Sequence, residues 1–388
     1  MHDAATPSRS QPITAGVLTA LVGFTSSFAV VLAGLTAVGA SPAQAASGLL
    51  VLCVAQALGM LWMSRRHRIP LSLAWSTPGA ALLAGTGVPD GGWPAAVGAF
   101  VVVGLLILLT ALWPHLGDLI AMIPAPIAQA MLAGVLLSLC LAPVRAVVDD
   151  PWVIAPVILT WLALVRFAPR LAVPAAFVVA LVVIVIWTAG HGGPTGDWLP
   201  RIEGTVPAFE VGALIGIALP LYVVTMASQN VPGVAVMASY GYQVPWRETM
   251  TVTGLGTVAG AFAGGHAVNL AAITAAISAG PDAGPDPKRR WIAAETAAWS
   301  YLVLAVASVA LTTLAVSGPP GVVETVAGLA LLGTLGASLS AAVSATEGRE
   351  AAVVTFVVAA SGVSVAGIGA AFWALVAGLV TAAVLRRR

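Results

Sequence analysis

Long apolar runs alternate along the whole chain with short breaks rich in proline, glycine or charge. Continuous runs of this kind predict membrane-spanning helices, whereas a β-barrel would show short segments of alternating hydrophobicity. The predicted fold is therefore an all-α polytopic protein embedded in a lipid bilayer. We divide the pattern into about 14 transmembrane segments, which cover residues 13–38, 42–63, 71–85, 93–113, 120–141, 150–167, 171–190, 208–228, 248–263, 265–279, 290–316, 321–342, 350–364 and 366–385.

The third and tenth segments are too short and too interrupted to be ordinary spanning helices. In the third, Ser76 or Thr77 can cap a helix start, and Pro78 suits the first helical turn. The tenth contains a glycine pair followed by His266 and Asn269. Interrupted segments at matching positions of two halves are typical of the binding site of a secondary transporter. We therefore expect half-helices at these two places.

Composition agrees with the membrane assignment and excludes several functions. The chain is 59% hydrophobic and only 8% charged, against about 25% charged residues in a soluble domain. Its net charge of +1 indicates no nucleic-acid partner. Cys53 and Cys140 lie in apolar runs without disulfide or metal spacing, and no ATP-binding motif is present. We expect no cofactor, no metal and no enzymatic activity.

The basic residues orient the segments. If the N-terminus is cytoplasmic and every segment crosses, all 16 basic residues lie inside except Arg145 and Arg201. This bias follows the positive-inside rule, and it places both termini in the cytoplasm. A cleaved signal peptide is the alternative for the N-terminus, because residues 43–45 resemble a cleavage site. The preceding apolar run is much longer than the hydrophobic region of such a peptide.

Fourteen segments divide into two repeats of seven, residues 1–190 and residues 208–388. Because seven is odd, the second repeat enters the membrane from the opposite side, which makes the repeat inverted. The N-termini of the two half-helices would then face each other near mid-membrane. A helix N-terminus carries a partial positive charge and free N–H groups, so the pair predicts an anion site built without lysine or arginine.

The polar and aromatic residues near these breaks are the candidate ligands. We expect substrate to contact residues from segments one, three, eight and ten, namely Phe24, Thr25, Ser26, Trp75, Ser76, Thr77, Gln229, Asn230, His266 and Asn269. Other roles are open for several of them. One alternative is that the hydroxyls of segment three cap a helix and bind no substrate. Another is that the two aromatic residues serve only in packing, and a third is that the Gln-Asn pair is a polar helix end.

His266 is the one ionisable residue that we place deep in the bilayer. Such residues are costly to keep there and usually have a function, and histidine titrates near neutral pH. We therefore expect His266 to carry the coupling proton. The alternative is a neutral histidine bonded to a backbone carbonyl. Glu295 and Glu324 are alternative proton carriers, although we expect Glu295 to pair with the basic cluster at 288–290.

Several stretches resemble the benzoate:proton symporter (BenE) family of bacterial inner membranes. They cover almost the whole chain, and residues 75–82 and 265–274 are specific. The matching stretches are GFTSS at 23–27, GASPAQ at 39–44, WSTPGAAL at 75–82, PAPIAQAMLAG at 124–134, GHAVNLAAIT at 265–274 and FWALVAGL at 372–379. The family looks distantly similar to nucleobase permeases such as uracil permease.

The resemblance implies a division into two domains and a function. The core domain would comprise residues 13–113 and 208–316, and the gate domain residues 120–190 and 321–385. The function would be import of benzoate with protons by alternating access. A homodimer formed through the gate domain is expected from the resemblance alone. In nucleobase permeases two acidic residues hold the base, and by position this chain has Gln229 and His266 there, which suits an anionic substrate.

Three other functions remain open at this stage. The same fold could carry another anion or a nucleobase. An intramembrane hydrolase could pair a serine with His266, but no GxSxG motif stands at a suitable turn. A channel would need no coupling, although inverted repeats suit alternating access better.

Overall fold

The computed structural model describes residues 10–113, 122–194, 196, 198–272, 274–344, 346, 348–365 and 368–385. In the first half the elements are α1 (Ser10–Thr25), α2 (Phe28–Ala37), α3 (Pro42–His67), β1 (Leu73–Trp75), α4 (Thr77–Ala84), α5 (Gly92–Leu112), α7 (Ala125–Cys140), α8 (Ala142–Asp149), α9 (Pro151–Phe167) and α10 (Pro169–Gly190). The charged turn that follows the fourth predicted segment lies outside the described residues.

The second half opens with a segment of mixed helical type, α11 (Val211–Ala213), η1 (Leu214–Ala218), α12 (Leu219–Thr225), η2 (Met226–Asn230) and α13 (Val231–Ser239). It continues with α14 (Trp246–Ala261), β2 (Val268–Leu270), α15 (Ala275–Ala279), η3 (Pro281–Ala283), η4 (Pro287–Arg289), α16 (Trp291–Ser317), α17 (Val322–Val343), α18 (Arg349–Ala360) and α19 (Ala370–Leu385). Among the described residues, 8 helical stretches are long and apolar enough to cross a membrane. The chain is a mostly helical, multi-pass membrane protein.

Each of the two interrupted segments consists of a short strand followed by a helix. Strands β1 and β2 pair antiparallel, with Leu73 opposite Leu270 and Trp75 opposite Val268. Backbone N–H and C=O groups inside a bilayer must find partners within the protein. The two strands satisfy each other in this way, and they bring the starts of the two segments together at the centre of the bundle.

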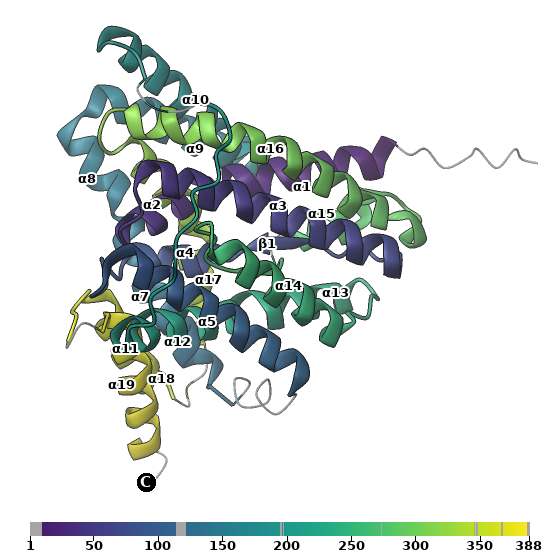
Figure 1. Ribbon diagram of the computed structural model, residues 1–388, viewed down its shortest axis with the longest axis vertical. Coiled ribbons are helices and arrows are strands. Elements are labelled where there is room, and N and C mark those ends of the chain that lie inside the picture. Colours follow the sequence, from purple (N-terminus) through teal and green to yellow (C-terminus); the bar gives the residue numbers. More distant parts are fainter. Residues whose placement is uncertain are drawn as a thin grey trace, which may run out of the picture.

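Helix packing follows one pattern in both halves (Figure 1). Helix α3 packs along α16, which joins the second predicted segment to the eleventh. In the same way α5 packs along α14, which joins the fourth predicted segment to the ninth. Helix α7 packs against α17 and α18, and α17 also packs against α9. If segment n of one half is exchanged with segment n+7 of the other, the α3–α16 pair becomes the α5–α14 pair and the α7–α18 pair becomes the α17–α9 pair, while the α7–α17 pair becomes itself. In Figure 1, α8, α9 and α10 lie at one end of the molecule, and α18 and α19 at another.

Segments one and eight are both interrupted, which the apolar pattern did not predict. Segment one breaks at Ser26 and Ser27, between α1 and α2. Segment eight does not end at residue 228 as predicted, because the helix continues to Ser239. The π-helical turns η1 and η2 each end two residues before a proline, at Pro220 and Pro232. Proline lacks an N–H, and a π turn accommodates the resulting gap in the hydrogen-bond ladder without ending the helix.

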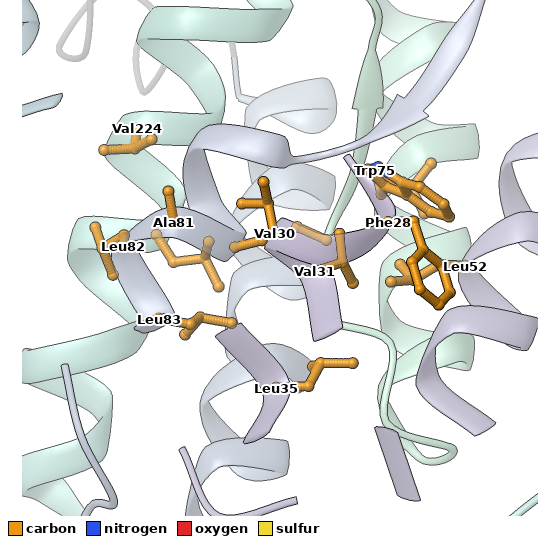
Figure 2. Packing of buried hydrophobic residues seen from close by; sticks show 14 of the residues in the cluster. Phe28, Val30, Val31, Leu35, Leu52, Trp75, Ala81, Leu82, Leu83 and Val224 are labelled. Carbon is orange, nitrogen blue, oxygen red and sulfur yellow. The ribbon is translucent and has the colours of Figure 1, made fainter. Parts of the chain in front are cut away.

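The bundle's interior is filled mainly by aliphatic side chains. Figure 2 shows residues of α2 and α4 packed between Val224 on one side and Phe28, Leu52 and Trp75 on the other. The two helices approach closely because Gly34 faces the backbone of Ala80. Small residues at such contacts let helix backbones meet in membrane proteins.

Replacing Gly34 with alanine is expected to destabilise the fold, because the new Cβ would collide with the Ala80 carbonyl. Overpacking of this kind typically costs about 1–3 kcal/mol. Thermal unfolding in detergent measures the effect as a lower Tm. Gly333→Ala is the matched control, since a Cβ there would meet nothing within 4 Å. Equal Tm values for the two variants would contradict the close contact between α2 and α4.

Candidate functional site

A small cavity lies where the strand pair meets the breaks in segments one and eight. Its volume is about 60 Å³, below the roughly 300–1,000 Å³ typical of ligand pockets. Four of the ten predicted ligand residues line it: Ser26, Trp75, Thr77 and Gln229. The lining also includes residues not chosen as ligands from the sequence, among them Gly23, Ser27, Thr274 and Tyr301.

One side of the cavity is aromatic. The rings of Trp75 and Tyr301 meet edge to face, with centroids 6.4 Å apart. Phe24 is 1% exposed and packs behind Trp75, at a centroid distance of 5.7 Å. Phe24 therefore supports the wall and does not border the cavity. Aromatic rings prefer such offset and edge contacts with other rings, so this wall suits a flat aromatic ligand.

Two helices begin beside the cavity. Helix α2 starts after Ser27, and α4 starts after Ser76. The Thr77 hydroxyl donates to Ser27 Oγ at 2.8 Å and joins the two helix starts. Ser76 Oγ accepts from Gly79 N at 3.2 Å and lies 2.8 Å from Thr225 Oγ1. Ser76 thus acts as a buried cap, and two helix N-termini, whose N–H groups favour a negative charge, lie on this side of the cavity.

Two side chains in the lining have unused hydrogen-bonding groups. Neither the Gln229 amide nor the Tyr301 hydroxyl hydrogen-bonds to the described residues, and both residues border the cavity. Gly23 leaves space for that hydroxyl, because a Cβ there would collide with it. A lone tyrosine in an apolar segment needs a partner for its polar tip, and this signal could have identified Tyr301 from the sequence.

The π-helical turn η2 separates two neighbouring residues that the sequence analysis treated together. Gln229 faces the cavity. Asn230 is fully buried, and its Oδ1 accepts from Leu270 N at 2.8 Å, so it anchors strand β2. Thr25 also turns away from the cavity, because its hydroxyl donates to Leu21 O at 2.7 Å within α1.

His266, just before strand β2, and Asn269, within it, do not line the cavity, and both are fully buried. His266 Nε2 is 2.9 Å from Ser76 O. A carbonyl oxygen can only accept, so Nε2 carries the hydrogen. His266 Nδ1 is buried without a hydrogen-bond partner in the described part of the chain. The amide oxygen of Asn269 lies 3.1 Å from Ser76 N. Both residues therefore contact the backbone of Ser76, the cap of α4, whose neighbours Trp75 and Thr77 line the cavity.

The two glutamates considered as alternative proton carriers lie away from the cavity. Glu295 forms an ion pair with Arg65 from α3, so its predicted pairing with the cluster at 288–290 is wrong. The reason is tertiary, because α3 and α16 lie side by side and bring in a cation 230 residues away in sequence. Glu324 is exposed in the first turn of α17.

A multi-pass helical bundle with paired, interrupted segments around a central cavity is the architecture of a membrane transporter. The chain belongs to the benzoate membrane transport protein (BenE) family, whose model matches residues 6–384. This confirms the resemblance read from the motifs.

Two relatives match over nearly their full lengths. The inner membrane protein YdcO of Escherichia coli (strain K12) is 38% identical over 96% of this chain and 95% of its own. The benzoate membrane transport protein of Acinetobacter baylyi (strain ATCC 33305 / BD413 / ADP1) is 27% identical over 94% of this chain and 92% of its own.

Solved structures show the same fold at low sequence identity. The transmembrane domain of the cyanobacterium bicarbonate transporter BicA matches with a TM-score of 0.60 at 14% identity, over 95% of this chain and 97% of that chain. The murine anion transporter Slc26a9 in its inward-facing state matches with a TM-score of 0.60 at 13% identity, over 99% of this chain and 69% of that chain. The protein is a membrane transporter with this fold.

Proposed function

We propose that this protein imports benzoate or a similar aromatic carboxylate together with protons. The observation that carries the proposal is the composition of the central cavity. Rings form one side, two helix N-termini and unused donors form the other, and no described lysine, arginine or carboxylate lines it. Such a site suits a flat ring that bears one negative charge. The name of the A. baylyi relative supports the same substrate class.

We further propose that transport occurs by alternating access of a core domain against a gate domain. The core would comprise residues 13–113 and 208–316, and the gate residues 120–190 and 321–385. The helix pairs that exchange with one another between the halves support a seven-plus-seven inverted repeat of 14 segments. The basic residues favour cytoplasmic termini. The inner-membrane name of the E. coli relative supports that location.

Proton coupling follows from the charge of the cargo. A negative cell interior opposes entry of a carboxylate by about 2.3 kcal/mol per 100 mV. One proton moving with each carboxylate removes that cost. His266 is our candidate carrier, because its buried Nδ1 has no partner among the residues that the structure describes and its Nε2 bonds to the residue that caps α4. Protonation there would alter the start of the helix that faces the substrate.

Uptake into proteoliposomes tests the proposal directly. Purified protein should accumulate labelled benzoate when the outside is more acidic, and not without a gradient. Unlabelled bicarbonate and uracil serve as competitors for the alternative cargoes. Uptake of labelled bicarbonate or uracil, with no uptake of benzoate, would replace the substrate assignment. Equal benzoate uptake with and without the gradient would contradict proton coupling and indicate uncoupled flux, as through a channel.

Changing Gln229 to glutamate is expected to raise the KM for benzoate by about tenfold or more. The variant loses the amide donors and places a second negative charge in the cavity, and each 1.4 kcal/mol of repulsion is worth a factor of ten. Gln44→Glu is the matched control. Gln44 completes the capping box of α3 on an exposed surface, where glutamate serves equally well. An unchanged KM in Gln229→Glu would remove this residue from the substrate site.

A further inference from the structure

Arg290 is a buried cation held by backbone carbonyls. It is 8% exposed and precedes the first residue of α16. Its Nη1 donates to Ala279 O at 2.7 Å, and its Nε donates to Gly284 O at 2.8 Å. It forms no ion pair with any carboxylate in the described ranges. A buried charge without a counter-ion is costly, so its retention calls for a specific role.

The neighbouring acidic residues are engaged elsewhere. Glu295, one turn into α16, pairs with Arg65. Asp286 Oδ1 accepts from Lys288 N and caps η4. Backbone carbonyls therefore compensate the charge of Arg290, together with the Tyr242 hydroxyl, which also contacts its guanidinium. Ala279 is the last residue of α15. The carbonyls at the C-terminus of a helix have no partner within the helix and attract a cation.

The segment that Arg290 holds forms one wall of the central cavity. Helix α15 has 5 residues and is too short to be stable alone. Directly before it, Ala271, Ala272 and Thr274 line the cavity. Within it, Ser278 Oγ lies 3.0 Å from Thr19 Oγ1 and accepts from Ser72 Oγ at 3.1 Å. The wall is thus fixed by the strand pair at one end and by Arg290 at the other.

We infer that Arg290 is a positioning residue for transport, which sets the wall formed by Ala271, Ala272 and Thr274 without touching the substrate. The inference rests on the proposed function, because it gives that wall a part in substrate binding. Lysine cannot replace the arginine, because a single ammonium group does not reproduce a planar guanidinium whose Nε and Nη1 donate to two carbonyls at once.

Kinetics of Arg290→Lys and Arg290→Gln test the inference. Both variants should raise the KM for benzoate about tenfold while Vmax, per folded transporter, stays within about twofold. Lys288→Gln is the control, because it removes the same charge from an exposed position in the same turn. A purely structural role would reduce only the amount of folded protein and would leave both KM and Vmax per folded transporter unchanged. That outcome, or an unchanged KM, would overturn the inference. If Arg290→Gln does not fold, the KM and Vmax of Arg290→Lys alone test the inference.

A second measurement separates this inference from the choice of substrate. Thr274→Cys places a thiol in the wall, and its labelling by a small maleimide requires no substrate. Adding Arg290→Lys should change the labelling rate at least about fivefold, whereas adding Lys288→Gln should not. If Arg290→Lys changes the labelling rate but the protein does not transport benzoate, the role of Arg290 is supported and the proposed substrate is rejected. An unaltered rate would reject the role itself.

Discussion

Joining residue 170 to residue 282 by a thiol cross-linker is expected to abolish net uptake. Arg170 begins α10 in the proposed gate domain, and Asp282 lies in η3 of the proposed core domain. Their side chains form an ion pair with Nη1 and Oδ2 2.8 Å apart. Alternating access requires the two domains to move against each other. A covalent bridge at this point would hold them in one arrangement.

The cross-link is the appropriate test because loss of the charges alone would have little effect. The two side chains are 63% and 45% exposed, and such surface pairs contribute about 0–1 kcal/mol. The doubly substituted chain, Arg170→Cys with Asp282→Cys, should transport normally until the reagent is added. Its native thiols, Cys53 and Cys140, are buried.

Arg66 and Glu248 provide the matched control. They also form an ion pair, between exposed Arg66 and half-buried Glu248, with Nε and Oε1 2.9 Å apart, but both belong to the proposed core. Cross-linking cysteines at these two positions should leave uptake nearly unchanged. Transport that survives the 170–282 cross-link, or that both cross-links stop equally, would contradict the proposed division into core and gate.

Replacing His266 with glutamine is expected to remove accumulation driven by a proton gradient and to spare exchange. The glutamine amide still offers an N–H to the carbonyl of Ser76, which His266 Nε2 contacts at 2.9 Å. It cannot take up a proton. With one proton per carboxylate, one pH unit supports about tenfold accumulation, and the variant should show none. External benzoate should still exchange for internal benzoate.

Two further variants complete this test. Glu295→Gln and Glu324→Gln should retain gradient-driven uptake, because Glu295 is paired with Arg65 and Glu324 is exposed. Accumulation by His266→Gln equal to that of the wild type would assign the proton to another group. Loss of exchange together with accumulation, in a folded protein, would make the histidine a structural support for α4.

The local properties of the chain were sufficient for the class, the family and the positions of two interrupted segments, the third and the tenth, but not for the break in segment one or the π-helical turns of segment eight. Apolar runs long enough to cross a bilayer predict spans wherever they occur. The Ser-Thr-Pro sequence at 76–78 marks a helix start by its own chemistry, and α4 begins there. The family motifs are also read directly from the sequence. None of these inferences depends on which segment packs beside which.

Only the tertiary structure decided which side chains reach the cavity. The π-helical turn sends Gln229 inward and Asn230 to strand β2, although the two are adjacent in sequence. The partner of Glu295 is Arg65 on another helix. The carbonyls that hold Arg290 become available because a short helix ends beside it. The direction of a side chain depends on helix rotation and on distant neighbours, and hydrophobic periodicity is uninformative when all faces of a helix are apolar.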